Sequence, residues 1–202
     1  MEKKSFILKN RKLIIILTAI LAAAAVIPLF SLRINPDLES YLPDNIESRI
    51  NNQKIGDLFG TKEPIVVILS TEDVLAPETL ERVDNLTNGF RDLGTLSPIQ
   101  SLSTAKNIRG EDGMMLVDPV IDYYPQSEEE REELRNRIKG NDLAYKLLVS
   151  EDFKNTMILL NSDLSVKDAE LMNQIDSIIT LYPGNEEVLI NGQPYLRDEA
   201  NA

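Results

Sequence analysis

The sequence predicts an α+β fold, in which one N-terminal transmembrane helix is followed by a domain of two βαβ units with a hairpin and helix insertion. Two observations support this prediction. Residues 13–32 are twenty residues without a charged side chain, and as a helix they would be about 30 Å long, the thickness of a bilayer's hydrocarbon core. After them, apolar strands and amphipathic helices alternate in two similar series.

The charge distribution predicts how the chain is oriented. The 202 residues carry a net charge of -12, yet residues 1–33 hold six Lys or Arg and one Glu, so their net charge is +5 and the remainder carries -17. Basic residues before an apolar span tend to stay in the cytoplasm. We therefore expect residues 1–12 to be cytoplasmic, residues 13–32 to cross the cell membrane, and the acidic domain to be extracytoplasmic. A cleavable signal peptide is the alternative, because Ala22 to Ala25 could supply a cleavage site.

The composition excludes several kinds of chemistry. Without His or Cys, the chain cannot form disulfides, zinc fingers, a Cys nucleophile or a His base, and a metal site would need carboxylate and carbonyl oxygens. An acidic chain with few aromatic residues is also a poor nucleic-acid binder. We therefore predict no enzyme activity, no catalytic residue, no cofactor, no metal and no nucleic-acid partner.

The elements after the span follow in order. Residues 33–60 are predicted to run extended and then to form a short helix from about Asp44, its cap, to Phe59. The predicted α+β domain, residues 61–192, opens with a buried strand at Pro64 to Ser70. A helix from about Ala76 to Gly94 and a return strand at Ile99 to Ser103 complete the first βαβ unit.

The second unit repeats this order. Asn155 to Asn161 is an apolar strand, and Ser165 with Asp168 resembles a capping box that opens a helix ended by Pro183 and Gly184. Glu187 to Asn191 supplies the closing strand. Two such units most economically share one sheet with helices on one face, as in a ferredoxin-like split βαβ arrangement.

The insertion between the units is predicted to be irregular and to add little core. Gly110 to Gly113 indicates a hairpin turn before a strand at Met114 to Val117, and residues 150–154 indicate a second turn. Ser127 with Glu130 forms a capping box for a helix that Gly140 ends. We expect the cluster Met115, Leu116 and Val117 to be core.

The polar residues that attract notice all have structural explanations. The acid run from Glu128 to Glu133 lacks calcium-loop spacing, and Glu133 with Arg137 favours a solvated helix face. Asp112 and Asp152 are expected in turns rather than as paired catalytic carboxylates. The serines considered as nucleophiles have no base to activate them: Ser70, Ser101 and Ser103. We name no substrate-binding residue.

The order of motifs resembles the start of a resistance-nodulation-division superfamily transporter. The motifs are INPDLESYLPDN (34–45), DLFG (57–60), EPIVVILS (63–70), IRGEDGMMLVDPVI (108–121), LLVSEDFKNTMILL (147–160) and VLINGQPYLRDE (188–199), behind a single span. The resemblance is strongest to the predicted exporters related to mycobacterial large membrane proteins and to Patched-like, sterol-sensing-domain proteins, and it covers essentially the whole chain.

This resemblance implies a function and partners. In that family the first span leads to an extracytoplasmic porter domain, and later spans carry the acids that couple transport to protons. Gly192 to Tyr195 match the exit from the porter domain, so residues 193–202 would lead into a second span absent here. The implied chain is an N-terminal fragment of a proton-driven exporter of hydrophobic, amphiphilic or lipid-like substrates. Its partners would be the lipid bilayer and the remaining transmembrane and porter domains, with oligomers possible.

Two other classes stay open on the sequence. The alternative is a complete membrane-anchored extracytoplasmic interaction module without transport activity. An anchored hydrolase is the third class, although no group of residues supports it.

Overall fold

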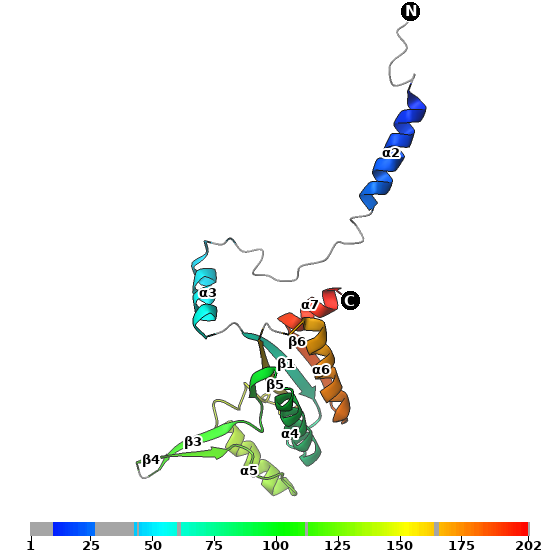
Figure 1. The fold of residues 1–202 in the computed structure, drawn as a ribbon. Coiled ribbons are helices and arrows are strands. Elements are labelled where there is room, and N and C mark those ends of the chain that lie inside the picture. The colour runs from blue at the N-terminus through cyan, green and yellow to red at the C-terminus, as the bar shows by residue number, and fades with distance from the viewer. Residues whose placement is uncertain are drawn as a thin grey trace, which may run out of the picture. The chain divides into compact units, whose positions relative to one another are not determined.

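The chain divides into two compact units, residues 1–35 with 201 and residues 36–200 with 202. The first unit contains helix α2, and the second contains the remaining helices and all described strands (Figure 1). The computed structural model describes residues 10–26, 43, 45–59, 62–111, 113–163 and 166–201.

Helix α2 (Arg11–Val26) contains most of the predicted span. It has no buried residue, and the Thr18 hydroxyl donates to the Ile14 carbonyl at 2.8 Å within the helix. The predicted span 13–32 is described only as far as Val26. Nowhere in the described part of the chain is a helix both long enough and apolar enough to cross a membrane, so the span stays a prediction.

The main sheet is built from both βαβ units. Its strands are β1 (Lys62–Ser70), β2 (Leu96–Gln100), β5 (Asn155–Asp163) and β6 (Glu187–Gly192). Their order is β2-β5-β1-β6 with antiparallel neighbours. Each unit therefore has two parallel strands separated by a strand of the other unit. This is the split βαβ order, and the predicted α+β class with a shared sheet is confirmed.

Helices α4 (Pro77–Asp92) and α6 (Asp168–Leu181) lie on one face of this sheet (Figure 1). Every second residue of β1 points to the same face of the sheet, and the apolar residues of α4 recur at helical spacing. The apolar face of the strand therefore packs against the apolar face of the helix. The first core consists of Ile65, Val67, Leu69, Val83, Leu86, Phe90, Leu96, Ile158, Leu160, Leu171, Met172 and Ile175.

The insertion has a core of its own, which corrects the prediction that it adds little. Its elements are β3 (Lys106–Glu111), β4 (Met114–Pro119) and α5 (Glu128–Lys139). The sequence signal was weak because the contributing residues come from short, separated segments. The second core consists of Val74, Leu75, Leu80, Leu102, Ala105, Val120, Leu134, Ile138, Ala144, Leu148, Val149 and Phe153.

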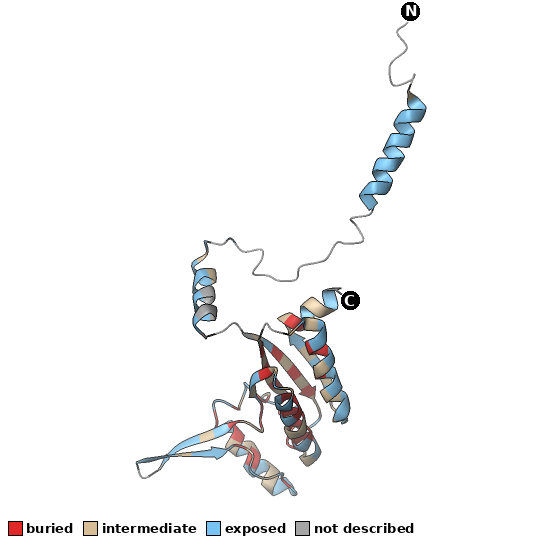
Figure 2. Cartoon of the chain, viewed as in Figure 1, coloured by how far each residue is buried: buried red, intermediate tan, exposed pale blue. Residues whose placement is uncertain are grey.

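The β3-β4 hairpin is exposed, so the prediction that Met115 and Val117 are core is wrong. Val117 pairs with Ile108, and Met115 pairs with Gly110, so these residues share one face of the ribbon. Met115 is 74% exposed, Val117 52% and Ile108 56%, and Leu116 is half-buried. A separate two-stranded sheet has no second layer to bury its apolar side, and Figure 2 shows the hairpin mostly pale blue. We call Ile108, Met115 and Val117 the hairpin patch.

Several predicted boundaries differ from the structure. Strand β2 ends at Gln100 rather than Ser103, because the Ser101 N–H donates to Thr104 Oγ1 at 2.8 Å and starts a turn. The second hairpin is reduced to isolated bridges, in which Val149 pairs with Thr156. Helix α3 (Glu47–Phe59) begins three residues later than expected, and its proposed cap Asp44 lies outside the described residues.

The start of α6 also differs. Lys167 is its N-cap and makes no side-chain capping bond, while Ser165 lies outside the described residues. After β6 the chain forms helix α7 (Gln193–Asn201), whose Pro194 is buried. Gly192 allows this turn, since it has a φ of +143° and a Cβ there would lie 2.6 Å from the Pro64 carbonyl oxygen.

Candidate functional site

A cleft of about 620 Å³ lies between the first turns of α4 and the loop that joins α6 to β6. The helix supplies Glu78, Thr79, Glu81, Arg82 and Asn85 to its lining, and the loop supplies residues 181–186. Its volume lies within the range of small-molecule sites. We take this cleft as the candidate site, because two charged side chains are buried in its wall.

The charged pair joins Arg82 of α4 to Glu186, the residue before β6. Arg82 Nη1 lies 2.6 Å from Glu186 Oε2, and the two side chains are only 8% and 6% exposed. Arg82 Nε donates to the Tyr182 carbonyl at 2.9 Å, and the Thr79 hydroxyl donates to Glu186 Oε1 at 2.7 Å. A buried ion pair is tolerated when further hydrogen bonds satisfy it, as here.

These contacts keep Glu186 ionised. Burial alone raises the pKa of Glu186, but hydrogen bonds from Thr79 and Arg82 outweigh burial and hold that pKa below its ordinary value. The cleft wall therefore holds a fixed positive and a fixed negative group side by side.

Gly184 lets the loop approach this pair closely. A Cβ at that position would lie 2.5 Å from Arg82 Cδ and 2.7 Å from Arg82 Nη1. Real Cβ contacts do not come this close, so any larger residue would push the guanidinium aside. The sequence analysis identified Gly184 only as a helix terminator.

The mouth of the cleft is acidic. Glu78 and Glu81 are exposed on α4, whereas Arg82 is buried below them. The cleft lining thus combines a buried ion pair with two exposed carboxylates.

A second cavity of about 350 Å³ is lined by Asp84, Ser103 and residues 121–124. Burial, then nearby Asp84 and Glu81, raises the pKa of Tyr124. The hydroxyls of Ser101 and Ser103 are hydrogen-bonded across 3.0 Å, and the Thr87 hydroxyl donates to Ser101 Oγ at 2.9 Å. These hydroxyls form a buried polar link between α4 and the turn after β2.

The residues weighed as possible catalysts are not brought together. The Ser70 hydroxyl donates to Asn155 Oδ1, and Asp152 Oδ1 accepts from the Lys154 N–H at 3.1 Å. The Ser150 hydroxyl and the Lys154 N–H lower the pKa of Asp152, which is a turn residue as predicted. Asp112 lies outside the described residues.

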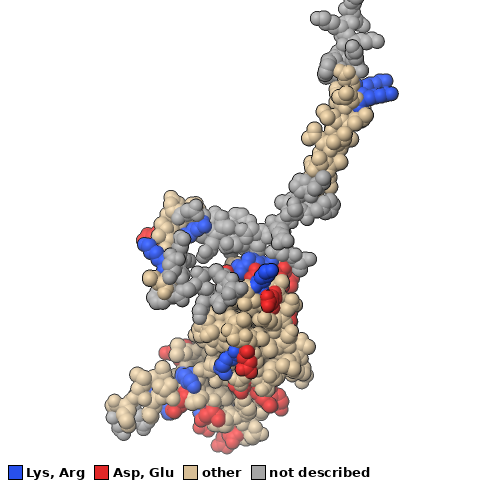
Figure 3. All heavy atoms as spheres, in the orientation of Figure 1, with Lys and Arg blue, Asp and Glu red and all other residues tan. Residues whose placement is uncertain are grey.

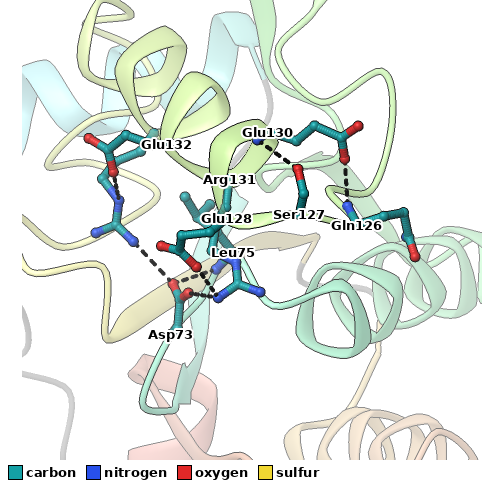
Figure 4. Close-up of polar contacts among 9 residues, drawn as sticks. Asp73, Leu75, Gln126, Ser127, Glu128, Glu130, Arg131 and Glu132 are labelled. Atoms are coloured by element: carbon teal, nitrogen blue, oxygen red, sulfur yellow. Dashed lines mark hydrogen bonds and ion pairs between the residues drawn. The ribbon is translucent and has the colours of Figure 1, made fainter.

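The acid run lies on α5 and interacts with neighbouring arginines. Ser127 caps the helix, since its Oγ accepts from the Glu130 N–H at 3.2 Å (Figure 4). The predicted capping box is confirmed only in this half, because the Glu130 carboxylate accepts from the Gln126 N–H at 2.7 Å and not from the Ser127 N–H. Glu128 pairs with Arg131 at 3.2 Å, and Arg131 also reaches Asp73 at 3.3 Å. The expected Glu133 partner, Arg137, instead pairs with Asp122 at 2.9 Å. Within the described ranges, no three acidic side chains could hold a metal ion.

The sequence analysis missed the Arg82 and Glu186 pair. The two residues are 104 positions apart, so no local spacing connects them. The available signal was Arg82 itself, a charged residue next to Val83 on the apolar side of α4. A charge there requires a buried partner.

Comparison with known proteins finds no match, either to protein-family models or to curated proteins. The resemblance to transporter sequences therefore stays a prediction.

Proposed function

We propose that this chain supplies the first transmembrane span and the first porter domain of a proton-driven exporter of hydrophobic, amphiphilic or lipid-like substrates. In this proposal the lipid bilayer and the further spans and porter domains are its partners, and the domain lies outside the cell membrane. One observation carries the proposal. The strand by which the chain enters the described domain, β1, lies beside the elements by which it leaves, β6 and α7.

The entry and the exit are held together by side chains and by the sheet. Glu63, in the entering strand β1, accepts from Arg197 of α7 at 2.9 Å. Gly192, the last residue of β6, is opposite Ile65 of β1. A domain with adjacent entry and exit can be inserted between two membrane spans, because neither connection has to cross the domain.

Helix α2 supports the membrane part of the proposal. From Leu13 to Val26 it carries no charged residue, and Figure 3 shows blue atoms at one end and tan atoms along the rest of its described surface. A helix that is apolar on all sides needs an apolar surrounding, which a bilayer provides. The basic residues before it favour a cytoplasmic N-terminus.

A second candidate function is a membrane-anchored interaction module without transport activity. The hairpin patch favours it, since three apolar side chains that are each more than half exposed lie on one face of the ribbon. Exposed apolar surface of this kind is typical of protein contact sites.

Topology reporters and the gene sequence test the proposal. A reporter fused at residue 10 should report the cytoplasm, and one fused at residue 150 should report the extracytoplasmic side. A cytoplasmic signal at residue 150 contradicts the exporter proposal. The gene sequence after codon 202 separates the two candidate functions. The exporter proposal predicts that the reading frame continues into a hydrophobic segment. A stop codon without a neighbouring transporter gene favours the interaction module.

A further inference from the structure

The hydrogen-bond pattern of the β3-β4 ribbon fixes which of its backbone groups point outward. The Val120 N–H donates to the Ala105 carbonyl at 2.9 Å, directly before the first pair of the ribbon. Hydrogen-bonded and non-hydrogen-bonded pairs alternate along an antiparallel ladder, and the N–H and C=O groups of the non-hydrogen-bonded pairs point away from the partner strand. On β4, the residues whose N–H and C=O groups both point outward are therefore Met115 and Val117.

The outer edge of β4 is free, whereas that of β3 is partly covered. The buried Asn141 side chain donates from Nδ2 to the outward Lys106 carbonyl at 3.0 Å, so the loop after α5 lies against the start of β3. Within the described ranges, no hydrogen bond reaches the outward groups of Met115 and Val117. Both residues belong to the exposed hairpin patch, and Figure 1 shows the ribbon projecting beyond the main sheet. A strand edge of this kind is a template for another strand.

A second copy of β4 matches this edge. When Met115 of one copy lies opposite Val117 of the other in an antiparallel pair, both N–H and both C=O groups of each copy are used. The pair is symmetric about Leu116, as a two-fold interface requires. A pair centred on Val117 would instead place Met115 opposite Pro119, which has no N–H for the Met115 carbonyl.

The side chains of β4 also allow this pairing. Asp118 is the one charged residue of the strand, and Arg109 of the same ribbon pairs with it at 2.7 Å. In the symmetric pair, Asp118 lies opposite Met114 of the second copy, so like charges do not face each other. On the patch face, Met115 lies beside Val117 of the second copy, which covers apolar surface of both.

We propose that two copies of this chain associate through antiparallel pairing of their β4 strands, which joins the two ribbons into one continuous sheet. The contact is one short strand from each copy, and interfaces below about 1,200 Å² are weak and transient, so we expect a dissociation constant above about 1 μM. This association goes beyond the proposed function, because it depends on the ribbon and holds whether or not the chain belongs to an exporter.

Single cysteines test the pairing directly, because the chain has no cysteine of its own. In the proposed dimer the two Leu116 residues form a non-hydrogen-bonded pair with Cα atoms about 4.5 Å apart, which suits a disulfide. Leu181→Cys is the control, since Leu181 is 64% exposed and lies on α6, outside the ribbon. The full chain in maltoside detergent is mildly oxidised, and dimers are measured on non-reducing gels.

Leu116→Cys should give at least about five times the dimer yield of Leu181→Cys, because only the first places two thiols within disulfide distance. The yield should fall on dilution, as a weak dimer requires. Equal yields for the two variants overturn the proposal, since random collisions within micelles would then explain both.

A matched pair of prolines tests the edge. Val117→Pro removes an outward N–H of β4 without removing a bond of the ribbon, and Ile108→Pro makes the same change in the opposite residue of β3. Placed in the Leu116→Cys background, Val117→Pro should reduce crosslinking to the level of Leu181→Cys, and Ile108→Pro should preserve it. Crosslinking that survives Val117→Pro overturns the pairing. If a proline unfolds the ribbon by circular dichroism, the single-cysteine comparison decides.

A polarity-sensitive dye on the Leu116→Cys variant tests for a different occupant of the edge. In the proposed dimer its emission should shift to the blue with rising chain concentration, with or without phosphatidylcholine vesicles. A blue shift that requires vesicles and appears without crosslinking overturns the proposal and assigns the ribbon to a membrane surface.

Discussion

Arg197 of α7 donates from Nη1 to Oε1 of Glu63 in β1 across 2.9 Å. The same guanidinium donates from Nε and Nη2 to Asp168, the first residue of α6, at 2.8 and 2.9 Å. Hydrogen bonds to Asp168 and then to Glu63 raise the pKa of Arg197 further above its ordinary value. One side chain thus joins a strand and two helices that are far apart in the sequence.

We predict that Arg197→Lys destabilises the domain, because an ammonium group cannot bond two carboxylates with the geometry of a planar fork. Partial exposure limits the loss to about 1 kcal/mol. Arg109→Lys is the control, since Arg109 and Asp118 pair at 2.7 Å with side chains 58% and 52% exposed. Urea unfolding followed by circular dichroism should show a lower midpoint for Arg197→Lys alone. Equal midpoints for both variants would contradict a structural role for the Arg197 contacts.

Gly184→Ala should disturb the buried pair in the cleft. The added Cβ would lie 2.5 Å from Arg82 Cδ, and a displaced guanidinium leaves Glu186 without its partner. We expect a loss of about 2 kcal/mol in the free energy of unfolding. At Gly140, a Cβ would meet only the Arg137 and Asn136 carbonyl oxygens at 3.6 Å, so Gly140→Ala should change stability little. The idea fails if thermal unfolding shows no difference between these two variants.

The same pair predicts an acid dependence of stability. The folded state lowers the pKa of Glu186, so its contribution is complete above the unfolded pKa of about 4.3 and is lost as pH falls through the folded value. Glu186→Gln leaves Arg82 buried without a counter-ion and should cost about 3 kcal/mol at neutral pH. The gap between the wild type and this variant should stay constant above about pH 5.5 and narrow below about pH 4. A gap that does not depend on pH would show that ionisation of Glu186 is not involved.

The order of the main sheet could be predicted from the sequence because each element carries a local signal. Val66 and Val67 lie in an uninterrupted apolar run, and Val83, Leu86 and Phe90 lie at helical spacing. Two units with the same strand, helix, strand order then have few ways to share one sheet. The boundaries of β2 and α6 were less predictable, since β2 ends at a turn that the Thr104 hydroxyl stabilises and α6 begins after Lys167 without a side-chain cap.

The cleft and the second core could not be predicted, for a different reason. Arg82 meets Glu186, and Leu134 packs in one cluster with Phe153, only after distant segments fold together. The local sequence even favours the wrong outcome, because Leu134 lies on a highly charged helix and is buried, whereas Met115 lies on an apolar strand and is exposed. Whether such a side chain is buried depends on whether a segment distant in sequence packs over it. Hydrophobic periodicity does not specify that segment.

The last prediction tests whether the insertion is an integral part of the domain. Leu134 of α5 is fully buried in the second core, whereas Leu143 is 58% exposed, and changing either one to Ala removes the same atoms. Leu134→Ala should cost about 2–5 kcal/mol, because it leaves a cavity in a packed core. Leu143→Ala should cost less than about 0.5 kcal/mol. Because the second core also contains Leu80 of α4, hydrogen exchange should show weaker protection in α4 as well as in α5 for Leu134→Ala. Loss of protection in α5 alone would mean that the insertion unfolds independently of the sheet.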